Sequence, residues 1–218
     1  MRVEPPAIFV VDDDSSARDG IEDLLQSVGL RVIAFSSPQA FLESERPDAP
    51  GCIILDMRLP NTSGLDFQKV LIEAGIELPV IFVTGHGDIP MSVTAMKSGA
   101  IEFLTKPFRD QCLLDAINSG IAKDQQRRSE LRVVSELRQR YESLTPRERE
   151  VFALVITGRP NKQLAIELGL SEMTIKVHRS QITKKMRASS IVELVRFADR
   201  LGIFAKEPWP SKTKELGV

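Results

Sequence analysis

The 218-residue chain is poor in several residue types: it has two cysteines, two histidines, one tryptophan and one tyrosine. Cys52 and Cys112 each lie in an apolar stretch, so we expect two packed thiols rather than a disulfide or a metal-binding pair. His86 has no second histidine or cysteine near it in the sequence, which argues against a metal site there. The scarcity of these residues excludes a disulfide scaffold and disfavours a zinc centre.

Long apolar runs are also missing. The chain has no run of about 18 apolar residues, and its first six residues (MRVEPP) lack the apolar stretch of a signal peptide. The hydrophobic fraction of 42% and the charged fraction of 27% are ordinary for a soluble protein. We therefore expect a cytoplasmic protein without a membrane partner, long enough to form two domains that each bury a core.

Charge is distributed unevenly. Residues 1–122 contain 18 acidic and 9 basic side chains, whereas residues 123–205 contain 17 basic and 10 acidic ones. An acidic first half favours a bound cation, and a basic second half favours a polyanionic partner. Solvated charged faces produce similar imbalances, so this feature is weak support by itself.

The first half alternates short apolar runs with amphipathic stretches. Strands that are apolar throughout suit a parallel sheet that is covered on both faces. We therefore predict an α/β domain over residues 7–122, with a doubly wound five-stranded parallel sheet. The predicted strands are 7–11, 31–35, 52–55, 80–83 and 101–104, and the predicted helices are 15–28, 38–43, 64–74, 88–98 and 110–122.

Residues 123–143 form a predicted linker. The stretch 121–140 has no glycine or proline and is mostly charged, and Leu131, Val134, Leu137 and Tyr141 form a short apolar stripe. This pattern favours a helix that continues from the last helix of the first domain. A flexible charged tether is the alternative.

The remaining sequence predicts an all-α domain of four helices over residues 144–205, followed by a flexible tail at 206–218. Thr145 before Pro146 is typical of a helix start, and Gly158 closes this helix. We expect Asn161 to cap a helix at 162–168, Ser171 to cap one at 172–186, and a last helix at 190–201. The two middle helices are separated by three residues, which is helix-turn-helix spacing.

Polar side chains follow the predicted strands of the first domain. Asp12 and Asp13 follow the first strand, Asp56 the third, Thr84 the fourth and Lys106 the fifth. Strand ends in a doubly wound sheet meet in one crevice. Three carboxylates there repel one another and need a cation, and oxygen ligands suit Mg²⁺. Taken singly, each residue has another explanation, since such aspartates often only cap the next helix.

The same residues suit phosphoryl transfer. Asp56 leaves a rigid apolar strand and could act as a nucleophile toward a phosphoryl group. Lys106 would supply a second positive charge and Thr84 a hydroxyl to the same phosphoryl oxygens. A cis peptide bond between Lys106 and Pro107 would aim the ammonium group inward.

A family resemblance supports this interpretation. The segments IFVVDDD, LDMRLPNTSGLD, VTGHGD and AIEFLTKPF resemble those of two-component receiver domains, which have a flavodoxin-like fold. From about Ile8 to Leu201 the chain resembles the FixJ subgroup of response regulators, which join a receiver to a LuxR-type DNA-binding domain. The resemblance implies that Asp56 is the phosphoacceptor and that Asp12, Asp13 and the backbone carbonyl of Arg58 complete a Mg²⁺ site.

The resemblance also assigns switch roles. It implies that Thr84 and Lys106 respond to the phosphoryl group and that Phe103 is the aromatic residue that rotates with them. A plain core phenylalanine is the alternative for Phe103.

The predicted helix 172–186 sorts into two faces. Ile175, Ile182 and Met186 lie on one face and Met173, Val177, Ser180 and Lys184 on the other, flanked by Lys176. A helix with such an outer face can enter a major groove.

DNA contacts can be assigned on that basis. Lys176, Val177 and Ser180 are candidates for contacts to bases, because lysine suits guanine acceptors and valine a thymine methyl. Contacts to phosphates are expected from Thr174, Arg179 and Lys184, and from Asn161 and Lys162 at the start of the preceding helix. His178 fits packing and phosphate contact equally well.

A basic helical bundle that binds protein, or no partner at all, is the alternative, but the string NKQLAIELGLSEMTIKVHRSQITKKM is similar to the LuxR-type helix-turn-helix. A metal-dependent phosphatase could use the carboxylate cleft, yet the sequence has no insertion large enough for a substrate cap. A receiver that acts by docking alone would not need residues 143–201. We therefore expect a transcriptional regulator rather than an enzyme.

The resemblance implies a mechanism for this regulator. A sensor histidine kinase would phosphorylate Asp56 in a phosphorelay that requires Mg²⁺. The helix 88–98 and the strand 101–104 would then pair two receivers. We expect the homodimer to bind promoter DNA and to control, most simply to activate, transcription by RNA polymerase.

Overall fold

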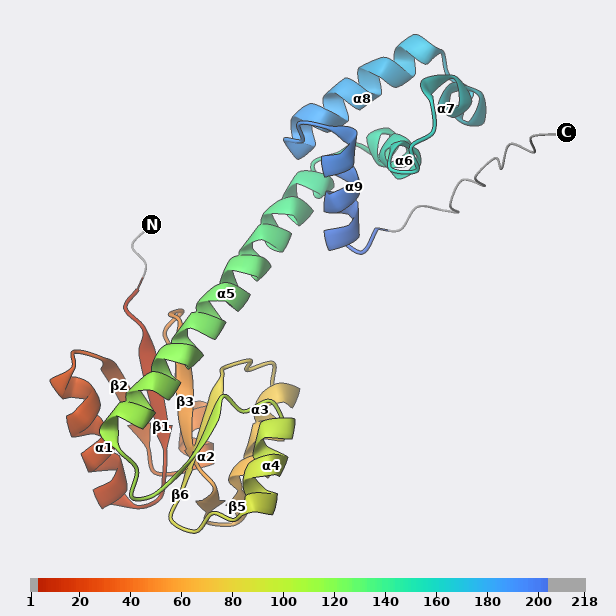
Figure 1. Cartoon of the computed structure of the whole chain (residues 1–218). Helices are drawn as coiled ribbons and strands as arrows, with labels where there is room; N and C mark the ends of the chain where they lie inside the picture. Colours follow the sequence, from red (N-terminus) through yellow and green to blue (C-terminus); the bar gives the residue numbers. More distant parts are fainter. Residues whose placement is uncertain (1–3, 204–218) are drawn as a thin grey trace, which may run out of the picture. The chain divides into compact units, whose positions relative to one another are not determined.

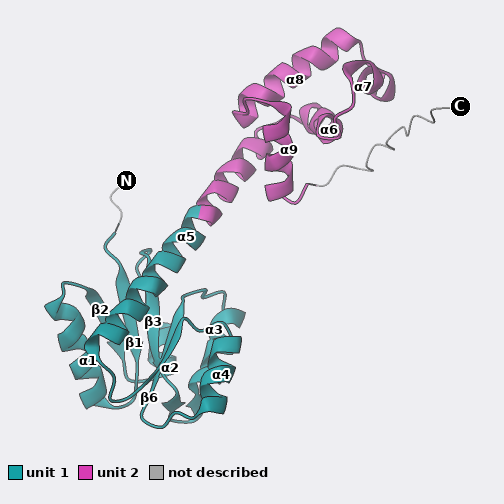
Figure 2. Ribbon diagram, viewed as in Figure 1, with its two compact units in different colours: residues 1–129 teal, residues 130–218 magenta. Residues whose placement is uncertain are grey.

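The computed structural model describes residues 4–203, so the predicted tail at 206–218 lies outside the described residues. The chain divides into two compact units, one of residues 1–129 and one of residues 130–218 (Figure 2). The border lies inside the predicted linker, and the predicted domain limits of 122, 143 and 205 remain predictions. Among the described helices, none is long and apolar enough to cross a lipid bilayer.

A five-stranded parallel sheet forms the centre of the first unit (Figure 1). Its strands are β1 (Ala7–Val11), β2 (Arg31–Phe35), β3 (Gly51–Asp56), β6 (Val80–Thr84) and β7 (Glu102–Thr105). The order β2-β1-β3-β6-β7 places a reversal of winding at β1 and β3, where such sheets open a crevice at their carboxyl ends. The predicted α/β fold is confirmed, with strand limits that move by one residue at most.

Helices cover both faces of this sheet. They are α1 (Ser15–Ser27), α2 (Pro38–Glu43), α3 (Gly64–Glu73), α4 (Ile89–Lys97) and the first part of α5 (Asp110–Glu142). Alternate residues of β1 belong to two different buried clusters: Phe9 packs with Phe41 and Phe67, and Val10 packs with Leu25 and Leu113. This alternation is what strands covered on both faces require, and it explains why the strands are apolar throughout.

A small hairpin was not predicted. It consists of β4 (Arg58–Leu59) and β5 (Thr62–Ser63), which pair antiparallel just after Asp56. Asn61 has a φ of 66° in the connecting turn, a conformation that asparagine tolerates better than most residues. Two-residue strands carry too little periodicity to be found in a sequence.

The helix α5 is continuous over 33 residues. It starts in the first unit and ends in the second, so the helical linker is confirmed and the flexible tether is not. No proline interrupts its sequence.

The second unit contains α6 (Pro146–Val155), α7 (Asn161–Leu168), α8 (Glu172–Met186) and α9 (Ile191–Arg200). Their common core includes Phe152, Leu164, Ile175 and Ile182. Gly169 ends α7 with a φ of 63°, which glycine adopts without strain. The predicted four-helix arrangement is confirmed.

One predicted cap is wrong. Asn161 is the first residue of α7 and not its N-cap; the N-cap position is Pro160, without a side-chain hydrogen bond. The Asn161 Oδ1 instead accepts a hydrogen bond from Arg179 Nη1 at 2.7 Å. A charged donor from α8 therefore takes the oxygen that would have capped the helix.

Candidate functional site

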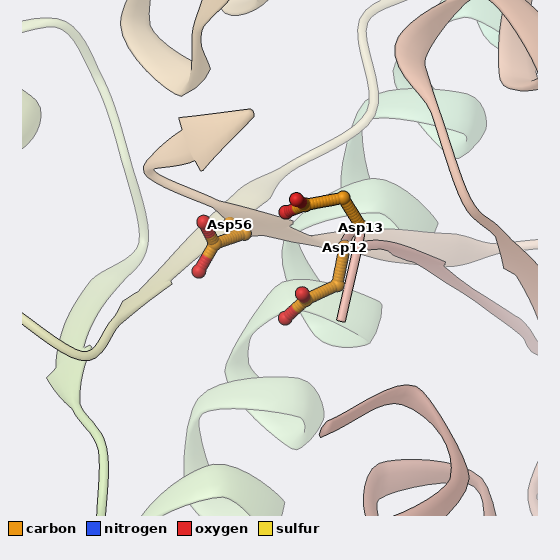
Figure 3. Close-up of side chains that lie close together, drawn as sticks. All are labelled: Asp12, Asp13 and Asp56. Atoms are coloured by element: carbon orange, nitrogen blue, oxygen red, sulfur yellow. The ribbon is translucent and has the colours of Figure 1, made fainter. Parts of the chain in front are cut away.

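Three carboxylates meet at the carboxyl ends of β1 and β3 (Figure 3). Oxygen atoms of Asp12, Asp13 and Asp56 all lie within 4.8 Å of one another. Asp12 and Asp56 are buried, with exposed fractions of 1% and 6%, whereas Asp13 is exposed. The cluster follows from the topology, because parallel pairing of β1 with β3 places Val11 opposite Leu55 and brings the next residues of both strands together.

Lys106 completes this cluster from the loop after β7. Its Nζ donates to Asp12 Oδ2 at 2.5 Å and to Asp56 Oδ1 at 3.2 Å. The peptide bond between Lys106 and Pro107 is cis, as predicted. The ammonium group thus lies between two buried carboxylates and balances part of their negative charge.

The pKa values of these groups depart from their ordinary ranges. Burial raises the pKa of the Asp56 carboxyl, and the positive charge of Lys106 and the hydrogen bond from the Arg58 N–H only partly oppose it. Burial would lower the pKa of Lys106, but its hydrogen bond to Asp12 and the charges of Asp12 and Asp56 raise it overall. Lys106 therefore remains positively charged next to Asp56 at neutral pH.

The donor set fits a divalent cation. All three side chains offer carboxylate oxygens, and the exposed Asp13 leaves one side of the cluster open to water, as Mg²⁺ requires. Arg58 lies beside the cluster, since its backbone N–H donates to Asp56 Oδ2 at 2.8 Å. The predicted metal ligands are therefore brought together, with Arg58 adjacent to them through its backbone.

The predicted switch residues lie on the neighbouring strands. Thr84 ends β6 and is fully buried, and its Oγ1 accepts a hydrogen bond from the His86 N–H at 3.2 Å. Phe103 lies on β7 and is half-buried against the core cluster of Phe9 and Phe82. It is thus neither a fully buried core residue nor a free surface residue.

Gly87, which was not predicted to be a site residue, lies against Phe103. A Cβ at position 87 would be 2.9 Å from Phe103 Cε1 and 2.8 Å from Thr105 Cγ2. Glycine is therefore required for the ring to occupy its present place. A lone glycine in a loop gives no such signal in the sequence, because the contact depends on the tertiary structure.

The outer face of α8 forms the second candidate site. Ile175, Ile182 and Met186 are fully buried, which confirms the predicted inner face. The four side chains predicted to face outward, together with Lys176, are all exposed: Met173, Lys176, Val177, Ser180 and Lys184. This helix presents two lysines, a hydroxyl and two apolar side chains to an incoming partner.

Comparisons with known proteins identify both halves. Residues 8–118 match the family model for the response regulator receiver domain, and residues 142–198 match the model for bacterial regulatory proteins of the luxR family. The chain belongs to the LuxR/FixJ family of response regulators. It therefore combines a receiver with a LuxR-type helix-turn-helix of transcription regulators, and the predicted family is confirmed.

Relatives in this family match nearly the whole chain. Nodulation protein W of Bradyrhizobium diazoefficiens is 52% identical, over 91% of this chain and 87% of the relative. The transcriptional regulatory protein FixJ of the same species is 40% identical, over 90% of this chain and 96% of the relative. The solved structure of the response regulator StyR is 47% identical, covers 90% of this chain and 100% of its own, and has a TM-score of 0.79.

Within the LuxR-type unit, some predicted phosphate contacts already have partners. Arg179 is half-buried and donates to Asn161, as described above. The hydroxyls of Thr174 and Ser171 lie 2.8 Å apart, whereas Lys162 is exposed. Arg179 and Asn161 therefore join α7 to α8.

A further contact of the LuxR-type unit was missed. Lys185 Nζ donates to Glu148 Oε2 at 2.6 Å, and the same carboxylate oxygen accepts from the Thr145 N–H at 2.7 Å. Glu148 is 6% exposed, and Thr145 completes a capping box with it. Lys185 therefore holds α8 on the start of α6, while its neighbour Lys184 points outward.

Proposed function

We propose that this response regulator accepts a phosphoryl group on Asp56 and then binds promoter DNA as a dimer. The observation that carries the proposal is the buried Asp56 carboxylate, which lies within 4.8 Å of two further carboxylates and 3.2 Å from the Lys106 ammonium. The family, whose members include a transcriptional regulatory protein, supports a role in transcription rather than in metabolism.

The transfer itself needs one nucleophile. A carboxylate oxygen of Asp56 attacks the phosphorus of a phosphohistidine, an O–P bond forms as the P–N bond breaks, and the electron pair of that bond returns to the imidazole. Asp12, Asp13, Asp56 and the Arg58 carbonyl would hold Mg²⁺, which when bound neutralises charge on the phosphoryl oxygens. Lys106 contacts the same oxygens from the other side and stabilises the acyl phosphate.

A kinase must reach Asp56 from outside. Beside Lys106 a groove of about 280 Å³ is lined by residues of α1 and of the loop before α5, among them Ala17, Gly20, Leu24, Pro107 and Phe108. The groove is mostly apolar along α1 and has the Lys106 side chain at its edge. A sensor histidine kinase can therefore dock on α1 while its phosphohistidine faces the carboxylates.

The switch connects the phosphoryl group to dimerisation. Thr84 turns toward the phosphoryl oxygens, and its hydroxyl exchanges the hydrogen bond from the His86 N–H for one to these oxygens. Phe103 moves into the space that Thr84 leaves. The helix α4 exposes Ile89, Val93 and Met96, with exposed fractions of 80%, 45% and 45%. A second receiver that packs on α4 and β7 would cover this apolar surface.

Dimerisation raises the affinity for DNA because two helix-turn-helix units then meet two half-sites together. Lys176, Val177 and Ser180 contact bases, and Lys184, Lys162 and Thr174 contact phosphates. Arg179 also contributes, through a guanidinium that Asn161 holds in place. The bound dimer then recruits RNA polymerase and activates transcription.

An electrophoretic shift with the full chain tests the proposal. The protein treated with acetyl phosphate and Mg²⁺ should bind DNA selected from a random pool more tightly than the untreated protein does. Asp66→Asn serves as the matched control, because Asp66 is an exposed aspartate of the receiver that pairs with Lys69. If Asp56→Asn responds to acetyl phosphate as the control does, the proposal is wrong.

A further inference from the structure

A buried carboxylate lies far from the phosphorylation site, on α5. Asp124 is fully buried and both its oxygens are hydrogen-bonded. Oδ2 accepts from the Gly51 N–H at 3.1 Å and from Arg128 Nε at 2.8 Å, and Oδ1 accepts from Arg127 at 3.0 Å and 2.6 Å. A buried charge is tolerated only with such complete pairing. We call Asp124, Arg127, Arg128 and Gly51 the α5 clamp.

The α5 clamp depends on a close approach between α5 and β3. A Cβ at Gly120 would be 2.9 Å from Cys52 Cβ, and a Cβ at Gly51 would be 2.1 Å from the Ala7 carbonyl oxygen. Glycine at position 120 therefore lets the helix lie against β3, and glycine at position 51 lets the start of β3 lie against β1. One turn after Gly120, the Asp124 carboxylate then reaches the backbone of Gly51.

Two exposed ion pairs extend the clamp. Arg127 pairs with Glu77 at 2.8 Å, and Arg128 pairs with Asp48. The Glu77 and Asp48 side chains are 62% and 97% exposed, so solvent screens these pairs and each contributes little. The stabilising part of the clamp is its buried centre, because solvent cannot reach the Asp124 carboxylate and take the place of its hydrogen-bond partners.

The α5 clamp and the phosphoacceptor lie at the two ends of β3. Gly51 begins β3 and Asp56 ends it, so the clamp and the phosphoacceptor lie at opposite edges of the sheet. The first compact unit ends at Ser129, one residue after Arg128. The α5 clamp therefore lies at the end of the first unit, just before the helix passes into the second.

We propose that Asp124 is a positioning residue that fixes the direction of α5 on the receiver. Because α5 starts near Lys106 and is held again at Asp124, its receiver half moves as one rigid element when the phosphorylation site changes. Without the clamp, the helix around residues 121–129 would open locally and transmit less of that change. This coupling role rests on the proposed function, whereas the fixing of α5 does not.

The test uses Asp124→Asn in the full chain, compared with Asp48→Asn as a matched control. The first variant keeps the size of the side chain but removes its charge and turns an amide N–H toward the Arg donors. The control makes the same chemical change on the exposed rim of the same clamp. Amide hydrogen exchange of Gly51 and residues 121–129 is the first measurement, and it needs neither phosphate nor DNA.

We expect exchange at these amides to rise by about tenfold or more in Asp124→Asn and by less than about twofold in the control. Equal exchange in the wild type and in Asp124→Asn overturns the proposal. If Asp124→Asn does not fold, Arg128→Met, which removes one donor from the same carboxylate, should show the same pattern with a smaller increase.

The second measurement tests coupling. Labelling by acetyl phosphate should stay within about twofold of the wild type, while the ratio of DNA affinities with and without the phosphoryl group should fall toward one. An unchanged ratio with raised exchange overturns the coupling role. If the wild type binds DNA equally tightly with and without the phosphoryl group, the proposed function fails. The exchange data then still decide whether Asp124 fixes α5.

Discussion

The two candidate sites differ in how their charges are paired. In the receiver, the buried carboxylates of Asp12 and Asp56 both pair with Lys106, which balances part of their charge. On α8, Lys176 and Lys184 are exposed, and within residues 4–203 neither forms an ion pair. A site for covalent chemistry needs a fixed geometry, and mutual pairing on strand ends provides it. A surface that binds a polyanion needs charges that no other side chain neutralises.

The largest expected effect is on phosphorylation, at the carboxylate cluster of the receiver. Asp56→Asn keeps the size of the side chain but removes the nucleophile, so labelling by acetyl phosphate in the presence of Mg²⁺ should be lost completely. Hydroxylamine-sensitive label on the intact protein is the measurement. Label that persists at the wild-type level would place the phosphoacceptor elsewhere and remove the contrast between the two sites.

A smaller effect is expected at the open edge of the same cluster. Asp13→Ala removes one of three negative charges near the cation, so Mg²⁺ should bind about tenfold or more weakly. The fold should remain intact because Asp13 is exposed. A calorimetric titration with Mg²⁺ measures the change in affinity. Asp14→Ala is a poor control because Asp14 caps α1. Asp66→Ala is the better one, and an equal affinity in both variants would mean that Asp13 is no ligand.

Much of both sites can be predicted from the sequence, for a physical reason. The strands β1, β3 and β6 are apolar up to their carboxyl ends, where Asp12 follows β1 and where Asp56 and Thr84 are the last residues of β3 and β6. Local pattern and parallel topology together therefore place these residues in one crevice. The inner and outer faces of α8 follow from helical periodicity alone. These features depend on residues that are close in sequence or on strand order.

The features that were missed depend on contacts between distant segments. Asn161 looks like a cap, yet Arg179 from another helix binds it. Lys184 and Lys185 are adjacent and chemically identical, and only the position of Glu148 on α6 separates an outward lysine from a paired one. Sequence periodicity specifies which face a residue occupies and cannot specify which partner reaches it.

On the outer face of α8, substitutions can separate contacts to bases from contacts to phosphates. Lys176 lies near the start of α8, where recognition helices approach base edges. Lys176→Ala should therefore cost about 1–3 kcal/mol on the selected DNA and much less on a scrambled duplex. Lys184→Ala should weaken binding to both duplexes about equally and lower the salt slope by about one unit per half-site. Equal losses on both duplexes for Lys176→Ala would show that this lysine contacts a phosphate.

The smallest expected effect concerns the lysine that is paired within the second unit. Lys185→Gln removes the charged partner of the buried Glu148 carboxylate and should destabilise that unit by about 1 kcal/mol, whereas Lys184→Gln should leave its stability nearly unchanged. Hydrogen exchange of the core amides of Phe152 and Ile175 measures this in the full chain, because a two-unit protein need not unfold in one step.

This difference should depend on pH in a defined direction. Although burial of Glu148 opposes ionisation, hydrogen bonds from Lys185 and Thr145 hold its pKa below the ordinary value of 4.5. A carboxyl with a lowered pKa in the folded state stabilises that state fully above its unfolded value and loses the contribution as the pH falls through its folded value. The wild type should therefore exceed Lys185→Gln in stability at neutral pH, and the gap should close below a pH of about 4.5. A gap that stays constant across this range would show that Lys185 stabilises the unit by packing of its aliphatic chain and not through the charge of Glu148.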